Sequence, residues 1–183
     1  MLKDAPPVKA AYALATALCL TALPAAAAAP ADPLAPAHAG KVQCFQPNMI
    51  RKTCRSIGAY SFEGGKITNR AQVLIPAQVP LVMVVNSPVT VRGQAVCGAI
   101  RAEDFATATF TAADQPVGEE PTRKLREVIG GAMASMIGKE VCTTIVQTGE
   151  SFHAEATVDG APKPELGQDV LWVGPADGYR VSP

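Results

Sequence analysis

The chain has 183 residues with 16 basic and 16 acidic side chains, and its hydrophobic fraction of 48% is that of an ordinary globular protein. This composition excludes a disordered or collagen-like chain, and the zero net charge removes the electrostatic reason to bind nucleic acid. Aromatic residues make up only 5% of the chain, so platforms for stacking bases or sugars are scarce.

The N-terminus has the pattern of a cleavable signal peptide. Lys3 and Lys9 form a short positive segment, residues 10–23 form an apolar run, and Pro24 ends that run ahead of several Ala-x-Ala cleavage sites. The run is shorter than the roughly 20 apolar residues that span a bilayer. We therefore predict that residues 1–29 are a signal peptide and that the mature protein is periplasmic or secreted and not transmembrane.

The segment after the leader is rich in alanine and proline and has no hydrophobic periodicity. We predict a flexible linker over residues 30–40, followed by one globular domain over residues 41–183. A second Ala-x-Ala pattern, Ala37-His38-Ala39, leaves room for cleavage at a later site.

Four cysteines follow the leader, and an even number in an exported chain predicts a disulfide framework. Four cysteines allow three pairings; we favour Cys44–Cys54, which closes a short loop, and Cys97–Cys142, which joins two distant strands. No zinc-knuckle spacing occurs and histidine is scarce, so we expect no metal site and no cofactor.

Turn signals predict two β-hairpins. Gly64-Gly65 lies between two strand-like segments from Ser56 to Ile75 and would place Glu63 opposite Lys66. Gly149-Glu150 lies between residues 141–148 and 151–159 in the same way, and its register places Cys142 opposite Thr157 and Ile145 opposite Ala154.

Between the hairpins, residues 81–85 read as a buried strand, and Asn86-Ser87-Pro88 reads as a turn before short strands at 89–92 and 95–100. Beyond the second hairpin, residues 170–173 and 179–181 suggest a final hairpin.

One amphipathic helix is predicted over about residues 122–138, where apolar residues recur at spacings of three and four. We expect Gly130-Gly131 to permit its close approach to a sheet. Together with the hairpins, the helix predicts an α+β fold: an antiparallel β-sheet built from hairpins, with this helix packed on it.

Candidate functional residues are few. Arg51, Lys52 and Arg55 form a basic cluster beside the Cys44–Cys54 loop, and we interpret them as a contact for an anionic envelope component. His153, Glu155 and Asp159 recur on one face of a strand and could serve in acid–base chemistry, although such alternation is also usual on the outer face of a sheet. No serine-nucleophile motif occurs.

These observations favour a non-catalytic exported binding or interaction domain, whose partner is an anionic envelope component or another exported protein. Two alternatives stay open. A secreted inhibitor or envelope structural protein would present a rigid, disulfide-anchored loop. A carboxylate-dependent hydrolase would need a cleft that brings Asp114, Glu119 or Glu120 toward His153.

Overall fold

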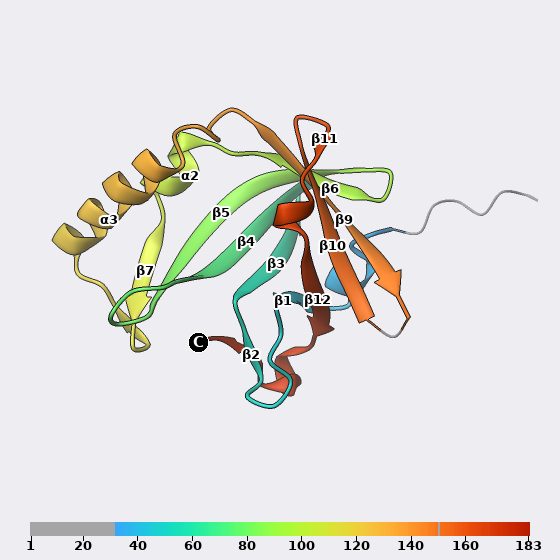
Figure 1. Ribbon diagram of the computed structural model, residues 1–183, viewed down its shortest axis with the longest axis horizontal. Helices are drawn as coiled ribbons and strands as arrows, with labels where there is room; N and C mark the ends of the chain where they lie inside the picture. Colours follow the sequence, from blue (N-terminus) through green and yellow to red (C-terminus); the bar gives the residue numbers. More distant parts are fainter. Residues whose placement is uncertain (1–31, 150) are drawn as a thin grey trace, which may run out of the picture.

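The computed structural model describes residues 32–149 and 151–183, so the predicted signal peptide lies outside the described residues. These residues form an eight-stranded antiparallel β-barrel with extra strands and one long helix (Figure 1). The prediction of an α+β fold with an antiparallel sheet is confirmed, and the structure adds that this sheet closes into a barrel.

The barrel strands follow one another around the ring in the order β1, β12, β10, β9, β6, β5, β4, β3, and β3 pairs again with β1. Their bounds are β1 Val42–Phe45, β3 Ser56–Glu63, β4 Lys66–Ile75, β5 Leu81–Arg92, β6 Ala95–Ala99, β9 Glu140–Thr148, β10 Ser151–Val158 and β12 Gln168–Val173.

Additional strands and helices lie around this ring. The additional strands are β2 Thr53–Cys54, β7 Thr109–Ala112, β8 Gln115–Pro116, β11 Ala161–Pro162 and β13 Arg180–Val181. The helices are α1 Ala35–His38, α2 Ala102–Ala106 and α3 Glu119–Ala132, with 3-10 turns η1 Pro164–Leu166 and η2 Pro175–Asp177.

Both predicted hairpins form with the expected registers. Strands β3 and β4 pair Glu63 with Lys66 around the glycine turn, and β9 and β10 pair Cys142 with Thr157 and Ile145 with Ala154. Each turn therefore sets which side chains of its two strands point into the barrel, because side chains alternate between the faces of a strand.

Strand β5 is continuous, so the turn predicted at Asn86-Ser87-Pro88 is wrong. Strand β4 pairs with β5 along residues 81–89, whereas the partner on the other side changes from β7 at residues 81–84 to β6 at residues 90–92. Pro88 lies between these two stretches. A proline is tolerated there because one side of the strand has no ladder partner.

The predicted final hairpin does not form either. Strand β13 pairs in parallel with β2 instead of with β12. It helps to cover a second small core on the outer side of the barrel wall, built around Cys44, Cys54, Ile57 and Val173.

Helix α3 begins and ends earlier than predicted. Pro121 lies in its first turn, where a proline breaks no helical hydrogen bond. The helix ends at Ala132, and residues 133–138 form turns, which agrees with the low helix propensity of Gly130-Gly131. The expected close approach at these glycines is wrong, because a Cβ at either position would meet no atom within 4 Å.

One face of α3 packs on the sheet through Leu125 and Ile129, which contact a cluster containing Met83 and Phe110. Val128 belongs to the same sequence stripe but is 70% exposed. No helix in residues 32–149 and 151–183 is long and apolar enough to cross a membrane.

The two predicted disulfides, Cys44–Cys54 and Cys97–Cys142, are both present. Cys97 on β6 lies directly opposite Cys142 on β9, with Cα atoms 4.0 Å apart. This bond closes the excursion that contains α2 and α3, and the pair of disulfides indicates an oxidising environment, periplasmic or extracellular.

Residues 32–40 do not form the flexible linker that the sequence predicted. Asp32 Oδ1 accepts a hydrogen bond from the Leu34 N–H at 2.9 Å, and α1 follows at once. Leu34 is only 1% exposed and packs with Val96, Trp172 and other side chains at one end of the barrel. The ordered domain therefore starts before Lys41, because an apolar anchor holds this segment in place.

Leu34→Ala should lower the free energy of unfolding by about 3 kcal/mol, since a fully buried leucine leaves a cavity when it is truncated. The emission of Trp172, the only tryptophan in the chain, should shift to longer wavelength as water reaches it. Urea unfolding and fluorescence measure both effects. Leu166→Ala, at a residue 42% exposed, is the matched control, and an equal loss of stability there would contradict the role of Leu34.

Candidate functional site

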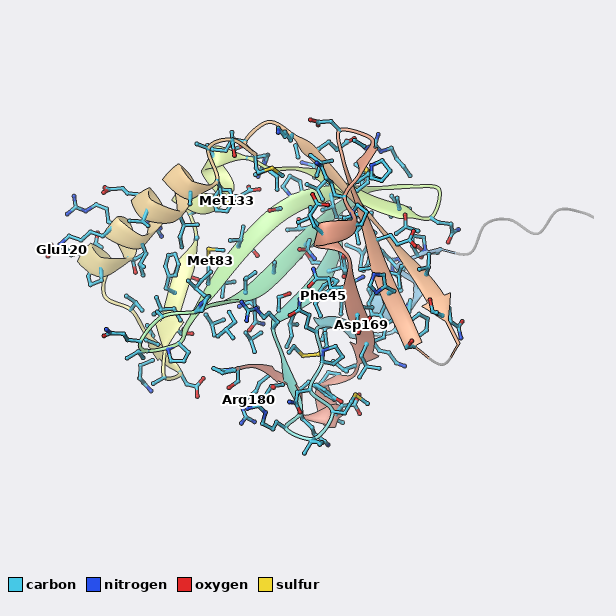
Figure 2. All side chains as sticks on the ribbon, in the orientation of Figure 1. Phe45, Met83, Glu120, Met133, Asp169 and Arg180 are labelled. Carbon is cyan, nitrogen blue, oxygen red and sulfur yellow. A yellow bond between two sulfur atoms is a disulfide. The ribbon has the colours of Figure 1, made fainter. Side chains whose placement is uncertain are left out.

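The barrel contains a cavity of about 260 Å³. Strands β1, β3, β4, β5, β6 and β9 contribute to its wall, and residues 100–105, which include most of α2, cover it where β5 and β6 diverge. Figure 2 shows Phe45 near the middle of the molecule and Met83 closer to α3. Most of the wall is apolar, and its members include Phe45, Ala71, Val73, Val85, Val89, Val96 and Val141.

A row of polar side chains crosses one side of this wall. Tyr60, Asn69 and Ser87 lie on adjacent strands, since Tyr60 pairs with Asn69 and Asn69 with Ser87. The Tyr60 hydroxyl donates to Gln43 Oε1 at 2.9 Å, and Asn69 Nδ2 donates to the Ala59 carbonyl at 3.3 Å. The cavity therefore has one row of polar side chains within a mostly apolar wall.

Gly58 makes room for this row. A Cβ at Gly58 would lie 3.2 Å from both Asn69 Nδ2 and Gln43 Oε1. Such contacts are closer than ordinary van der Waals packing, so a larger residue would displace the two amides. Glycine in the strand thus lets polar side chains occupy the space in front of it.

The phenol of Tyr60 is kept in its neutral form. Burial raises the pKa of Tyr60 to about 12, although the hydrogen bonds to Gln43 and Asn69 act in the opposite direction. A neutral phenol inside a mostly apolar wall can donate one hydrogen bond and accept others without bringing a charge into the cavity.

An acidic side chain holds α2 against the barrel. Asp104 is 3% exposed; its carboxylate accepts a hydrogen bond from Ser87 Oγ at 2.7 Å and one from Arg101 Nε at 3.1 Å. A second guanidinium nitrogen of Arg101 also contacts Asp104, and this hydrogen bonding raises the pKa of Arg101. The buried charge of Asp104 is therefore paired.

All these polar groups are satisfied. In the part of the chain that the structure describes, no buried side-chain nitrogen or oxygen lacks a hydrogen-bond partner. No cluster along the chain marks this site, because Gln43, Tyr60, Asn69 and Ser87 come from four strands. The available signal was a polar residue at an inward-facing position of an otherwise apolar strand face.

The basic residues singled out from the sequence lie away from the cavity wall. Arg51 and Lys52 belong to the loop between β1 and β2, Arg55 follows β2, and all three are exposed. None of them lines the cavity. Their role as ligand-binding residues remains a prediction.

The acid–base residues expected on one strand do not all lie on it, because β10 ends at Val158 and Asp159 follows it. His153 Nδ1 lies 3.0 Å from Asp169 Oδ1, and Asp159 Oδ1 accepts the Glu140 N–H at 2.9 Å. Figure 2 places Glu120 at the end of α3 that lies far from Asp169, the partner of His153, so Glu120 is not near His153. Within residues 32–149 and 151–183, no group of three or more His, Cys, Asp or Glu side chains could hold a metal ion.

Comparison with known proteins gives no assignment, because no family model, curated protein or solved structure matches this chain.

The raised pKa of Tyr60 predicts a specific loss of stability in alkali. Above pH 10 the unfolded chain releases this phenolic proton while the folded barrel retains it, so stability falls as pH rises from 10 toward 12. The free energy of unfolding should fall by about 3 kcal/mol through this proton as the pH approaches 12. Urea unfolding between about pH 9 and 11.5 measures it.

Tyr60→Phe should flatten this dependence, and Tyr179→Phe, which removes one phenol from outside the barrel, should leave it steep. If the free energy of unfolding fell equally steeply with pH in both variants, the burial of Tyr60 would not be the cause of the loss of stability in alkali.

Proposed function

We propose that this protein is an exported, non-catalytic binding protein whose barrel holds one small, uncharged, largely apolar ligand. The observation that supports this proposal is the cavity of about 260 Å³ inside the barrel, with apolar walls and one polar row. Eight-stranded barrels either fill their interior with side chains or retain space for one small ligand. The second arrangement is the one that this cavity supports.

The size of the cavity limits the ligand. An apolar cavity of about 150 Å³ accommodates benzene. By proportion, a cavity of about 260 Å³ accommodates a molecule of about ten non-hydrogen atoms. This is near the lower end of ligand sites, which start at about 300 Å³.

The charged residues of the cavity wall limit the chemistry of the ligand. Arg101 and Asp104 are the charged residues that line the cavity, and they neutralise each other. A charged ligand would lose its hydration without gaining an unpaired partner. A neutral ligand with one or two hydroxyl or carbonyl groups fits better, because Tyr60, Asn69 and Gln43 can exchange hydrogen bonds with it.

A second candidate function, a secreted inhibitor or envelope protein, is favoured by a separate feature. The loop between β1 and β2 is exposed and anchored at its base by the Cys44–Cys54 disulfide. This loop lies outside the cavity, so the two functions do not exclude each other.

Ligand binding is tested by filling the cavity. Ala71→Leu should lower the affinity for a bound small molecule at least tenfold, because the larger side chain occupies the space that Ala71 leaves in the wall. The probes are neutral aromatic and aliphatic alcohols of about ten non-hydrogen atoms, titrated by NMR. Native mass spectrometry of protein isolated from its host tests for a retained ligand.

Ala59→Leu is the matched control. Ala59 lies between Gly58 and Tyr60 on β3 and faces the opposite side from these two cavity residues, so binding should be unchanged. Absence of both a retained ligand and any probe-induced shift at cavity residues would reject the proposal.

Export is tested at the mature N-terminus. Because Leu34 anchors residues 32–40 to the barrel, we expect cleavage at an Ala-x-Ala site before Asp32 and not after Ala39. N-terminal sequencing of the native protein should therefore begin between Ala26 and Asp32. A start at Gly40 or Lys41 would contradict this site, and an intact Met1 on cytoplasmic protein would contradict export.

A further inference from the structure

The loop between β1 and β2 is held in one conformation by its base. Cys44 and Cys54, both almost fully buried, form a disulfide there. Asn48 and Thr53 exchange two backbone hydrogen bonds, of 2.7 and 3.2 Å, and Asn48 Oδ1 accepts the Arg51 N–H at 2.9 Å. The tip, residues 49–52, therefore has little conformational entropy to lose when it meets a partner.

Two large apolar side chains occupy this tip. Ile50 is 96% exposed and Met49 is 63% exposed, the former being the highest value among the exposed large hydrophobic residues described. The Tyr179 hydroxyl lies 3.3 Å from Met49 Sδ, so the methionine is positioned from its inner side. These two adjacent apolar side chains at the end of a pinned loop are exposed to a partner surface.

Four cations lie in the tip or next to it. Arg51, Lys52 and Arg55 are exposed on the loop and its base, and Arg180 is exposed on β13, where it pairs with Thr53. Figure 2 shows Arg180 at the lower end of the molecule, where Figure 1 places β2 and its loop. None of these four side chains forms an ion pair with another described residue.

We infer that this tip docks the protein on an anionic lipid bilayer, with Ile50 and Met49 inserted at the level of the headgroups and the four cations on the lipid phosphates. The inference is independent of the proposed cavity ligand. Interfacial segments bind by burying apolar area while cations neutralise anionic lipids, and this loop offers both at one point.

The charge distribution favours binding of the tip to the bilayer over attraction of the whole molecule to an anionic surface. The full chain carries a formal net charge of zero, so the molecule as a whole has no reason to gather on an anionic surface. A soluble polyanion would engage the cations and leave Ile50 in water. The apolar tip is therefore the feature that selects a bilayer as the partner.

The test is flotation of the mature protein with vesicles of phosphatidylcholine alone or with about 30 mol% phosphatidylglycerol. Binding should require the anionic lipid and should weaken between about 0.05 and 0.5 M salt. Neutralising Arg51, Lys52 and Arg55 to glutamine should lower the partition coefficient about a hundredfold, since each cation near the surface contributes about fivefold.

Ile50→Ser should lower binding about tenfold and leave the salt dependence intact, because it removes inserted apolar area and no charge. Val128→Ser on α3, also at a highly exposed apolar residue, is its control. The charge control replaces exposed Lys41, Lys66 and Arg123 with glutamine, which removes the same charge elsewhere. Both controls should bind like the wild type.

Insertion is read directly from Ile50→Trp in a Trp172→Phe background, whose emission should shift to shorter wavelength on anionic vesicles. Three outcomes would overturn the inference: no binding to anionic vesicles, an equal loss in the charge control, or unchanged binding in Ile50→Ser together with full competition by soluble dextran sulfate. The last outcome would identify a polyanion site instead. Capture of a protein partner at the tip, without vesicle binding, would support the inhibitor function.

Discussion

The pairing of β4 with β5 is the constraint on which the rest of the structure depends. It joins the two ends of what would otherwise be an open sheet and so removes two exposed edges. Strand β5 can do this because it is long: it pairs with β4 on one side, and on the other side it pairs first with β7 and then with β6. Closure turns one face of every strand inward.

The same division of β5 creates the opening that α2 covers. Where β7 has ended and β6 has not yet begun, Ser87 faces α2 and holds Asp104, and Arg101 completes the charge pair. A buried carboxylate is costly unless it is paired, so α2 has one favourable position over the cavity. The position of α2 over the cavity therefore follows from the change of the partner of β5 from β7 to β6.

The interior stays partly empty because several inward positions carry small residues. Gly58, Gly98 and Ala71 contribute little volume, and the neighbouring Gln43 and Asn69 are held by hydrogen bonds along the wall. The outer core is distinct: it packs Cys44, Cys54 and Ile57 under β13 and braces the exposed loop. The protein thus separates a hollow inner site from a rigid outer one.

The sequence by itself determined the two hairpin registers and indicated the single long helix and the favoured one of the three possible disulfide pairings. Short-range rules suffice for these, because a glycine turn specifies which residues of its strands face each other, and Cys142 then has a predictable face. It also singled out Arg51, Lys52 and Arg55 by their charge, although not the exposed Ile50 tip that accompanies them.

Only the tertiary structure decided barrel closure, the continuity of β5 through Pro88, the burial of Leu34 and the polar row from Gln43 to Ser87. Each depends on which distant segment lies alongside. Pro88 reads as a turn until one side of its strand is known to lack a partner, and Leu34 reads as part of a linker until the barrel end exists to receive it. A local pattern records a residue's preferences, whereas long-range pairing supplies the neighbours that satisfy or override them.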